Sequence, residues 1–182
     1  TLAFVTVELP DLTASNFTAP PTADYGQTIG VSWVVQNAGN VGTGVNTWTD
    51  RIWLSVDEVI SPNDILLGSW GNINYLNPTE SYTQTRNLTL PYGYFGVFHL
   101  IVEAGIGIQE VLKTNNTQHQ DLTITIPLLP DLQVESVAAP TAAFGGDHVT
   151  VSWVVKNHGN LDATRDWYDH IYLSGSSTFS AG

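Results

Sequence analysis

Hydrophobic and polar residues alternate with a period of two along much of this chain. In the segment 29–35, an isoleucine, two valines and Trp33 occupy alternate positions, with small or apolar residues between them. Such alternation is typical of a β-strand with one buried face. Similar runs predict strands at 48–54, 82–90, 97–104 and 121–126. No stretch has apolar residues at the spacing of an amphipathic helix.

Turn-forming sequences separate these runs. The segments "NAGN", "SPND", "LNPTE", "PYGYFG" and "KTNN" all carry the glycine, proline, asparagine or aspartate residues that favour turns. About seven short strands between such turns predict an all-β fold, an antiparallel β-sandwich. We expect Trp33 and Ile52 in its core.

The chain contains an internal duplication. "PDLTASNFTAP" from Pro10 matches "PDLQVESVAAP" from Pro130, an offset of 130 − 10 = 120 residues that continues through "VSWVVQNAGN" and "VSWVVKNHGN". "WTDRIWLS" from Trp48 then matches "WYDHIYLS" from Trp167 at an offset of 119, which places Trp153 and Ile171 in a second core. Self-similarity at a fixed offset indicates repeated structural units.

The positions at which the two copies begin and end predict three regions in the chain. Residues 1–9 align with the strand that starts at Asp121, so they are expected to be the last strand of a preceding repeat, or a strand donated to another chain. Residues 10–128 form one complete repeat, and residues 129–182 form the first part of a second. The sequence thus resembles a window on a longer tandem array.

The composition of the chain argues against several classes of function. With 17 acidic and 5 basic residues, the formal net charge is −12, which opposes binding to nucleic acid. The absence of cysteine excludes disulfides and thiolate chemistry. No apolar run approaches the roughly 20 residues needed to span a bilayer, so no membrane insertion is expected in this segment.

These motifs together resemble a known family. The opening "PDL", the segment "VSWVVQNAGN", the run "WTDRIWLSVDEVISPNDILLG" and the closing "QEVLKTNNT" are similar to the cell-adhesion-related domain found in bacteria (CARDB). The resemblance covers residues 10–127 and the visible part of the second copy. It implies an immunoglobulin-like sandwich, repeated in tandem in large exported bacterial and archaeal proteins as a spacer or adhesive module. The implied location is extracellular or on the cell surface.

No catalytic constellation is evident, and no catalytic residue is assigned. The five histidines, His99, His119, His148, His158 and His170, form no HExxH motif and no close His/Asp pair along the sequence. The last three lie in the second copy, and their counterparts in the first repeat are not histidines. A catalytic role would not survive that difference between copies, so we expect a protein that is not an enzyme.

An acidic loop is the main candidate for a metal site. Asp57, Glu58, Asn63 and Asp64 offer the hard oxygen ligands that calcium prefers. Their spacing matches no EF-hand, and the second copy replaces the first two acids with serines. A solvated turn closed by local side-chain bonds is therefore favoured over calcium, and no cofactor is expected.

The remaining polar and aromatic candidates favour structural roles. Glu110, Asn115 and Asn116 are expected to tie a hairpin to its neighbour, and Asp50 and Asp169 to make buried or edge hydrogen bonds, to a turn amide or to Arg51. Stacking of exposed aromatic residues on sugar rings is the alternative considered for six side chains: Trp48, Trp53, Trp70, Tyr75, Tyr92 and Tyr94.

Three functional hypotheses follow. The first is a structural or adhesive repeat forming a rod, stalk or filament, whose partners are neighbouring repeats or identical chains. The second is a module that binds calcium, or a glycan or protein at the cell surface. The third is a filament subunit assembled by donation of a β-strand.

Overall fold

The computed structural model describes residues 8–176. It divides into two compact units, Thr1–Pro127 and Leu128–Gly182. The sequence placed this boundary after residue 128. Residues 1–7, most of the expected closing strand, lie outside the described residues, and residues 8–11 precede the first strand without strand structure.

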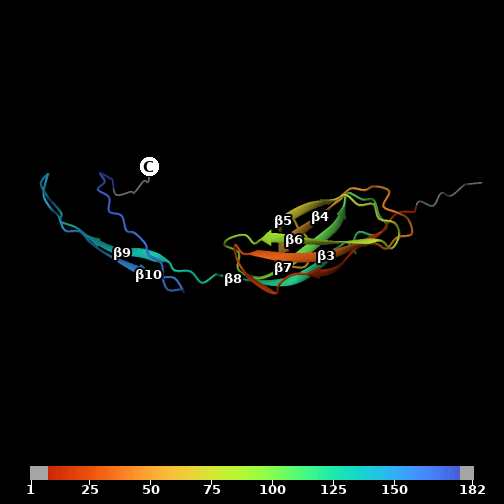
Figure 1. Ribbon diagram of the computed structural model, residues 1–182, viewed down its shortest axis with the longest axis horizontal. Helices are drawn as coiled ribbons and strands as arrows, with labels where there is room; N and C mark the ends of the chain where they lie inside the picture. The colour runs from red at the N-terminus through yellow and green to blue at the C-terminus, as the bar shows by residue number, and fades with distance from the viewer. Residues whose placement is uncertain (1–7, 177–182) are drawn as a thin grey trace, which may run out of the picture. The chain divides into compact units, whose positions relative to one another are not determined.

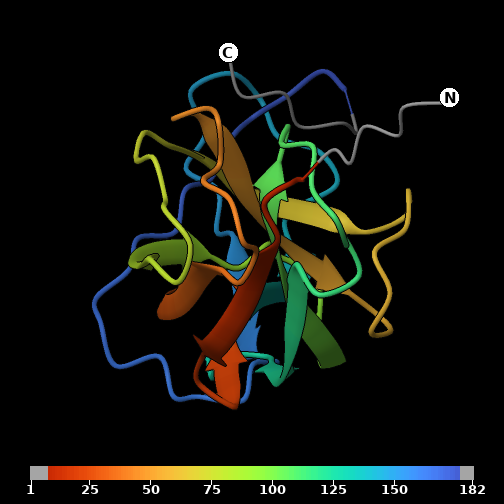
Figure 2. The same ribbon diagram turned by 90° about the vertical axis from the view of Figure 1, so that its right-hand side faces the viewer.

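The first unit is an antiparallel β-sandwich of two sheets (Figures 1 and 2). Its strands are β1 (Leu12–Thr18), β2 (Thr22–Asp24), β3 (Thr28–Asn37), β4 (Trp48–Ser55), β5 (Ile65–Asn72), β6 (Ser81–Thr89), β7 (Gly96–Ile106) and β8 (Thr117–Thr125). One sheet has the order β1-β3-β6 and the other β2-β8-β7-β4-β5. Only the short β2–β8 pair is parallel among the pairs described. The predicted all-β sandwich is confirmed.

The core lies between these two sheets and follows the alternation seen in the sequence. Every second residue of β3 points inward, and Trp33 in the middle of that strand is completely buried. Ile52 of β4 is also completely buried on the facing sheet. Apolar residues of β7 and β8 complete this layer. Burial of such side chains is the main favourable contribution to folding.

Strand β5 breaks the alternation and was not predicted as a separate strand. The register between β4 and β5 shifts between Ile52 and Trp53, where a β-bulge leaves Leu67 without a partner on β4. Leu67 and Trp70 therefore both pack against the core although they are three positions apart. A β-bulge changes which face the following residues occupy, so a simple period of two fails there.

The second unit contains one described sheet, formed by β9 (Leu132–Ala138) and β10 (Ser152–Asn157) (Figure 1). Leu132 pairs with Asn157 just as Leu12 pairs with Asn37 in the first unit. The expected burial of Trp153 and Ile171 is not observed: they are 39% and 58% exposed. The described part of this unit has no second sheet to cover them.

Candidate functional site

A single asparagine organises the loop that follows β3. Asn37 Oδ1 accepts hydrogen bonds from the backbone N–H of Asp11 (3.2 Å) and of Gly39 (3.0 Å). Its Nδ2 donates to the carbonyl of Val41 at 2.8 Å. The side chain is fully buried, so these bonds satisfy polar atoms that would otherwise be costly to bury. They hold the "NAGN" loop against the start of β1.

The same loop geometry recurs in the second unit, 120 residues later. Asn157 Oδ1 accepts the N–H of Asp131 and of Gly159, each at 2.9 Å, and its Nδ2 donates to the carbonyl of Leu161 at 2.7 Å. A backbone bond also recurs: the residue after each asparagine donates its N–H to the carbonyl of the aspartate just before β1 or β9, at 2.7 Å in both units. The duplicated phrase therefore specifies one local structure twice.

A buried carboxylate lies inside the first unit. Asp50 is completely buried, and its Oδ2 accepts hydrogen bonds from Trp33 Nε1 (3.1 Å) and the Tyr82 hydroxyl (2.7 Å). Its Oδ1 accepts the N–H of Gly105 at 3.3 Å. Burial raises the pKa of Asp50 above its ordinary value, and the hydrogen bonds from Tyr82 and Trp33 oppose that shift.

The tyrosine in this network is held in its neutral form. Burial, and then the neighbouring carboxylate of Asp50, raise the pKa of Tyr82 above its usual value. The Tyr82 hydroxyl therefore donates a hydrogen bond to Asp50 and accepts one from Trp48 Nε1 at 2.9 Å. These contacts agree with the expectation that Asp50 has a structural role. Its hydrogen-bond donors do not include Arg51.

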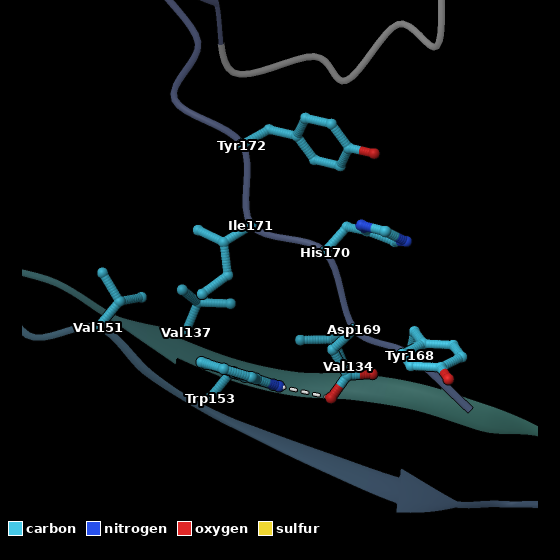
Figure 3. A pocket seen from close by; sticks show the side chains of 9 residues that line it. All are labelled: Val134, Val137, Val151, Trp153, Tyr168, Asp169, His170, Ile171 and Tyr172. Atoms are coloured by element: carbon cyan, nitrogen blue, oxygen red, sulfur yellow. Dashed lines mark hydrogen bonds between the residues drawn. The ribbon is translucent and has the colours of Figure 1, made fainter. Parts of the chain in front are cut away.

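The second unit repeats the tryptophan–aspartate pair in an exposed setting. Trp153 Nε1 donates to Asp169 Oδ2 at 2.8 Å, next to a shallow pocket (Figure 3). Val134 and Val137 of β9 line the pocket on one side, and the segment 168–172 lines it on the other. Figure 3 shows Ile171 pointing toward Val137. Residues that would form a core are here open to solvent.

Side chains of the acidic loop between β4 and β5 form hydrogen bonds that close turns within the loop. Asp57 Oδ1 accepts the backbone N–H two residues further along the chain, at 2.9 Å. Asp64 Oδ2 accepts the N–H of Ser61 at 2.6 Å, and Asn63 donates its N–H to Ser61 Oγ at 3.4 Å. Within residues 8–176, no group of three or more histidine, aspartate or glutamate side chains is placed to hold a metal ion.

Two histidines lie together on the outer face of the five-stranded sheet. His99 Nδ1 is 2.9 Å from Asp121 Oδ1, and His119 Nε2 is 3.4 Å from Glu58 Oε1. The two imidazole rings are 5.9 Å apart between centroids. The sequence analysis found no close His/Asp pair, and the fold corrects this, because the β7–β8 register places His99 opposite Asp121. Asp121 is largely exposed, whereas His99 Nδ1 is buried.

The segment between β7 and β8 is tied to the first strand. Glu110 Oε2 accepts the N–H of Leu12 at 2.9 Å, and its Oε1 accepts Asn116 Nδ2 at 2.7 Å. Asn115 Nδ2 donates to Asp11 Oδ1 at 3.0 Å. Burial raises the pKa of Glu110, opposed by the hydrogen bond from Leu12. Each candidate in this segment makes a structural contact.

The aromatic candidates separate by exposure. Trp48 is buried in the core, Trp53 and Trp70 are partly buried, and Tyr75, Tyr92 and Tyr94 are exposed. Tyr92 and Tyr94 lie in the β6–β7 loop, where Tyr92 covers Gly26 so closely that a Cβ there would clash with its ring. The large tryptophan faces are thus mostly committed to packing rather than open to a ligand.

The fold is that of a known domain. Among solved structures, the chain is similar to the solution NMR structure of a CARDB domain from Pyrococcus furiosus, with a TM-score of 0.50 and 20% identity over 66% of this chain and 100% of that domain. A crystal structure of the same domain, in complex with di-metal ions, matches with a TM-score of 0.49 and 21% identity over 68% of this chain and 100% of that one. The resemblance that the motifs indicated is confirmed at the level of the fold.

Other comparisons add less. A β-glucosidase from Listeria innocua, in complex with glucose, matches with a TM-score of 0.43 and 12% identity, over 63% of this chain and 16% of the enzyme. No protein-family model and no curated protein matches the sequence. The described residues include no helix long and apolar enough to cross a membrane.

Proposed function

We propose that this chain is part of a non-catalytic, extracellular structural or adhesive module, repeated in tandem in a rod, stalk or filament of a large exported prokaryotic protein. One observation carries the proposal: the hydrogen bonds of Asn37 recur around Asn157, and the Trp33–Asp50 bond recurs between Trp153 and Asp169. A repeated internal scaffold is the signature of an array of similar units.

The variable positions support the same proposal. Gln36 and Lys156 differ at equivalent places, as do Ala38 and His158, and all four side chains are exposed. The positions kept between the two units, such as Asn37, hold the loop together from inside. A module whose repeated residues are internal is suited to a spacer, with neighbouring repeats or identical chains as its first partners.

The native mass tests this proposal. Antibodies raised against residues 10–127 would be used to size the protein in the source cells, and electron microscopy would measure the length of the purified molecule. We expect a mass well above 19.8 kDa and a length that grows with the number of units. A native mass of 19.8 kDa would contradict the array and would instead favour assembly by strand donation, for which the open apolar face around Trp153 provides an acceptor.

We also propose that the module needs no cofactor. The oxygen atoms of Asp57 and Asp64 already accept backbone N–H groups, which is support for turn closure rather than calcium binding. We therefore expect the melting temperature to be the same in excess calcium and in a chelator. A rise in calcium that is abolished by Asp57→Asn with Asp64→Asn would overturn this expectation, because a ligand that binds only the folded state stabilises it.

A further inference from the structure

The outer face of the β1-β3-β6 sheet carries no charged side chain. On the edge strand β6, the outward-facing residues are Ser81, Thr83, Thr85, Asn87 and Thr89, and all five are exposed. Their neighbours on the strand point inward toward the other sheet. The outer side of β6 is therefore a continuous row of hydroxyl and carboxamide groups.

The row continues across the two neighbouring strands. The hydroxyl or carboxamide residues that point outward there are Thr28, Ser32 and Gln36 on β3, and Thr13, Ser15 and Thr18 on β1. Gly30 and Val34 complete the outward positions of β3. We call the outward-facing side chains of β1, β3 and β6 the hydroxyl face.

The absence of charge on this face is not a requirement of the fold. The whole chain has a net charge of −12. In the second unit, the positions equivalent to Ser15 and Gln36 are Glu135 and Lys156, whose charged groups lie 3.4 Å apart. The corresponding surface of the second unit therefore carries charges of both signs. The first unit presents an uncharged surface within a strongly acidic protein.

Part of the hydroxyl face is free to bind a ligand. The hydroxyls of Thr18 and Ser32 are 2.7 Å apart and pair with each other. In contrast, the side chains of Thr83, Thr85 and Asn87 make no hydrogen bond to any other described residue. Hydroxyl and carboxamide groups both donate and accept hydrogen bonds. These three residues therefore offer donors and acceptors that are now directed to solvent.

We propose that the hydroxyl face binds a neutral, hydroxyl-rich polysaccharide in an extended form. A polyanion is repelled by the acidic protein, and a polycation is attracted to the acidic loops rather than to this uncharged face. A neutral polymer of hydroxyl groups matches both the charge and the hydrogen-bonding capacity of the face. The outward side chains recur about every 6.8 Å along a strand and about every 4.8 Å across strands, which suits a polymer with a regular repeat.

This binding goes beyond the structural role proposed above and does not depend on it. Each hydrogen bond between hydroxyls replaces bonds to water, so one face alone is expected to bind weakly.

The test is a depletion assay with the full chain. Insoluble cellulose, chitin and β-1,3-glucan are the neutral probes, and alginate coupled covalently to beads, in calcium-free buffer, is the charged comparison. We expect retention on at least one neutral polymer and none on alginate. A variant with Thr83→Glu and Thr85→Glu should bind at least tenfold more weakly, because it places two negative charges on the face. A variant with Thr83→Val and Thr85→Val, which removes only the hydroxyls, should also lose binding.

A matched control adds the same charge elsewhere. Ser69→Glu with Thr117→Glu alters exposed residues of the five-stranded sheet and should leave binding unchanged, with circular dichroism confirming that every variant is folded. The proposal is overturned if no neutral polymer retains the chain, or if the control lowers binding as much as the Thr83 and Thr85 variants. It is also overturned if only Tyr92→Ala with Tyr94→Ala removes binding, or if the face proves to mediate self-association that Thr83→Glu abolishes.

Discussion

Single buried residues determine how the two sheets of the first unit are joined. Asp50 lies on β4, yet its donors come from β3, β6 and β7. A carboxylate in an apolar core is costly unless its oxygens are fully hydrogen-bonded. The three donors meet that condition, and they connect strands from both sheets at one point.

Removal of this carboxylate should be strongly destabilising. Asp50→Ala leaves Trp33 Nε1 and the N–H of Gly105 buried without an acceptor, and it opens a small cavity. We expect the free energy of unfolding of the first unit to fall by about 3 kcal/mol. Urea denaturation monitored by tryptophan fluorescence would measure this change. Asp57→Ala, at an exposed turn, is the control, and an equal effect of the two substitutions would contradict the assigned role.

The raised pKa of Asp50 also predicts a dependence on pH. Its ordinary pKa is 3.8 and its pKa in the folded protein is higher, so the folded state binds this proton more tightly than the unfolded state. The contribution of Asp50 to stability is therefore fully present below pH 3.8 and is lost as pH rises through the folded-state pKa. We expect the stability difference between the protein and Asp50→Asn to shift in favour of the variant as pH rises from below 3.8 to neutrality. A difference that stays constant with pH would refute this.

The sequence predicted a structural role for Asp50 but not its partners. The aspartate follows a tryptophan in both copies, which indicated a repeated internal hydrogen bond. Its donors lie 17, 32 and 55 residues away in the sequence. Only the packing of one sheet on the other brings them together. Local sequence offered only a turn amide or Arg51 as partners, and the guanidinium of Arg51 instead lies over the ring of Trp53.

At the scale of strands and loops, the close approach of two backbone segments is the main constraint on which residues a loop can hold. In the loop after β3, a Cβ on Gly39 would lie 2.7 Å from the backbone nitrogen of Asp11 and 3.0 Å from the backbone of Pro10. The bonds of Asn37 hold these two segments together, so neither segment moves without breaking them. The glycine of the "NAGN" phrase is therefore required by contact rather than by an unusual φ angle.

Gly39→Ala should destabilise the first unit by about 1 to 3 kcal/mol, because overpacking against backbone atoms forces the segments apart. Differential scanning calorimetry of residues 10–127 would measure the change. Gly71→Ala on β5 is the matched control, since nothing lies within 4 Å of its added Cβ. The argument fails if Gly39→Ala is tolerated as well as Gly71→Ala.

The strands also show where the alternation of hydrophobic and polar residues stops predicting the structure. Strands β3, β4, β6, β7 and β8 follow from alternation, because each has one face toward the core. The bulge beside Leu67 in β5 removes that regularity. The pairing of His99 with Asp121 depends on the register of β7 with β8, which no local pattern specifies. The hydroxyl face required the same information, since its three strands are not consecutive in the chain.

At the scale of the molecule, the two units differ in how completely they bury apolar surface. Trp33 is fully buried, whereas its counterpart Trp153 is 39% exposed beside an open pocket. Contiguous exposed apolar surface of this kind normally marks a contact with another surface. The second unit should therefore bind a hydrophobic dye, while the first unit should not.

The difference in exposed apolar surface between the two units can be measured with such a dye. The full 182-residue chain is expected to increase the fluorescence of anilinonaphthalene sulfonate, and residues 10–127 alone are expected to leave it unchanged. Trp153→Ser with Ile171→Ser should lower the signal of the full chain, because both side chains border the open pocket. The control is Tyr92→Ser, which changes an exposed aromatic residue of the first unit. Trp33 is not suitable, because loss of this buried side chain would unfold that unit. A strong signal from residues 10–127, or a signal of the full chain that is lost with Tyr92→Ser alone, would show that the dye binds the first unit and would contradict the prediction.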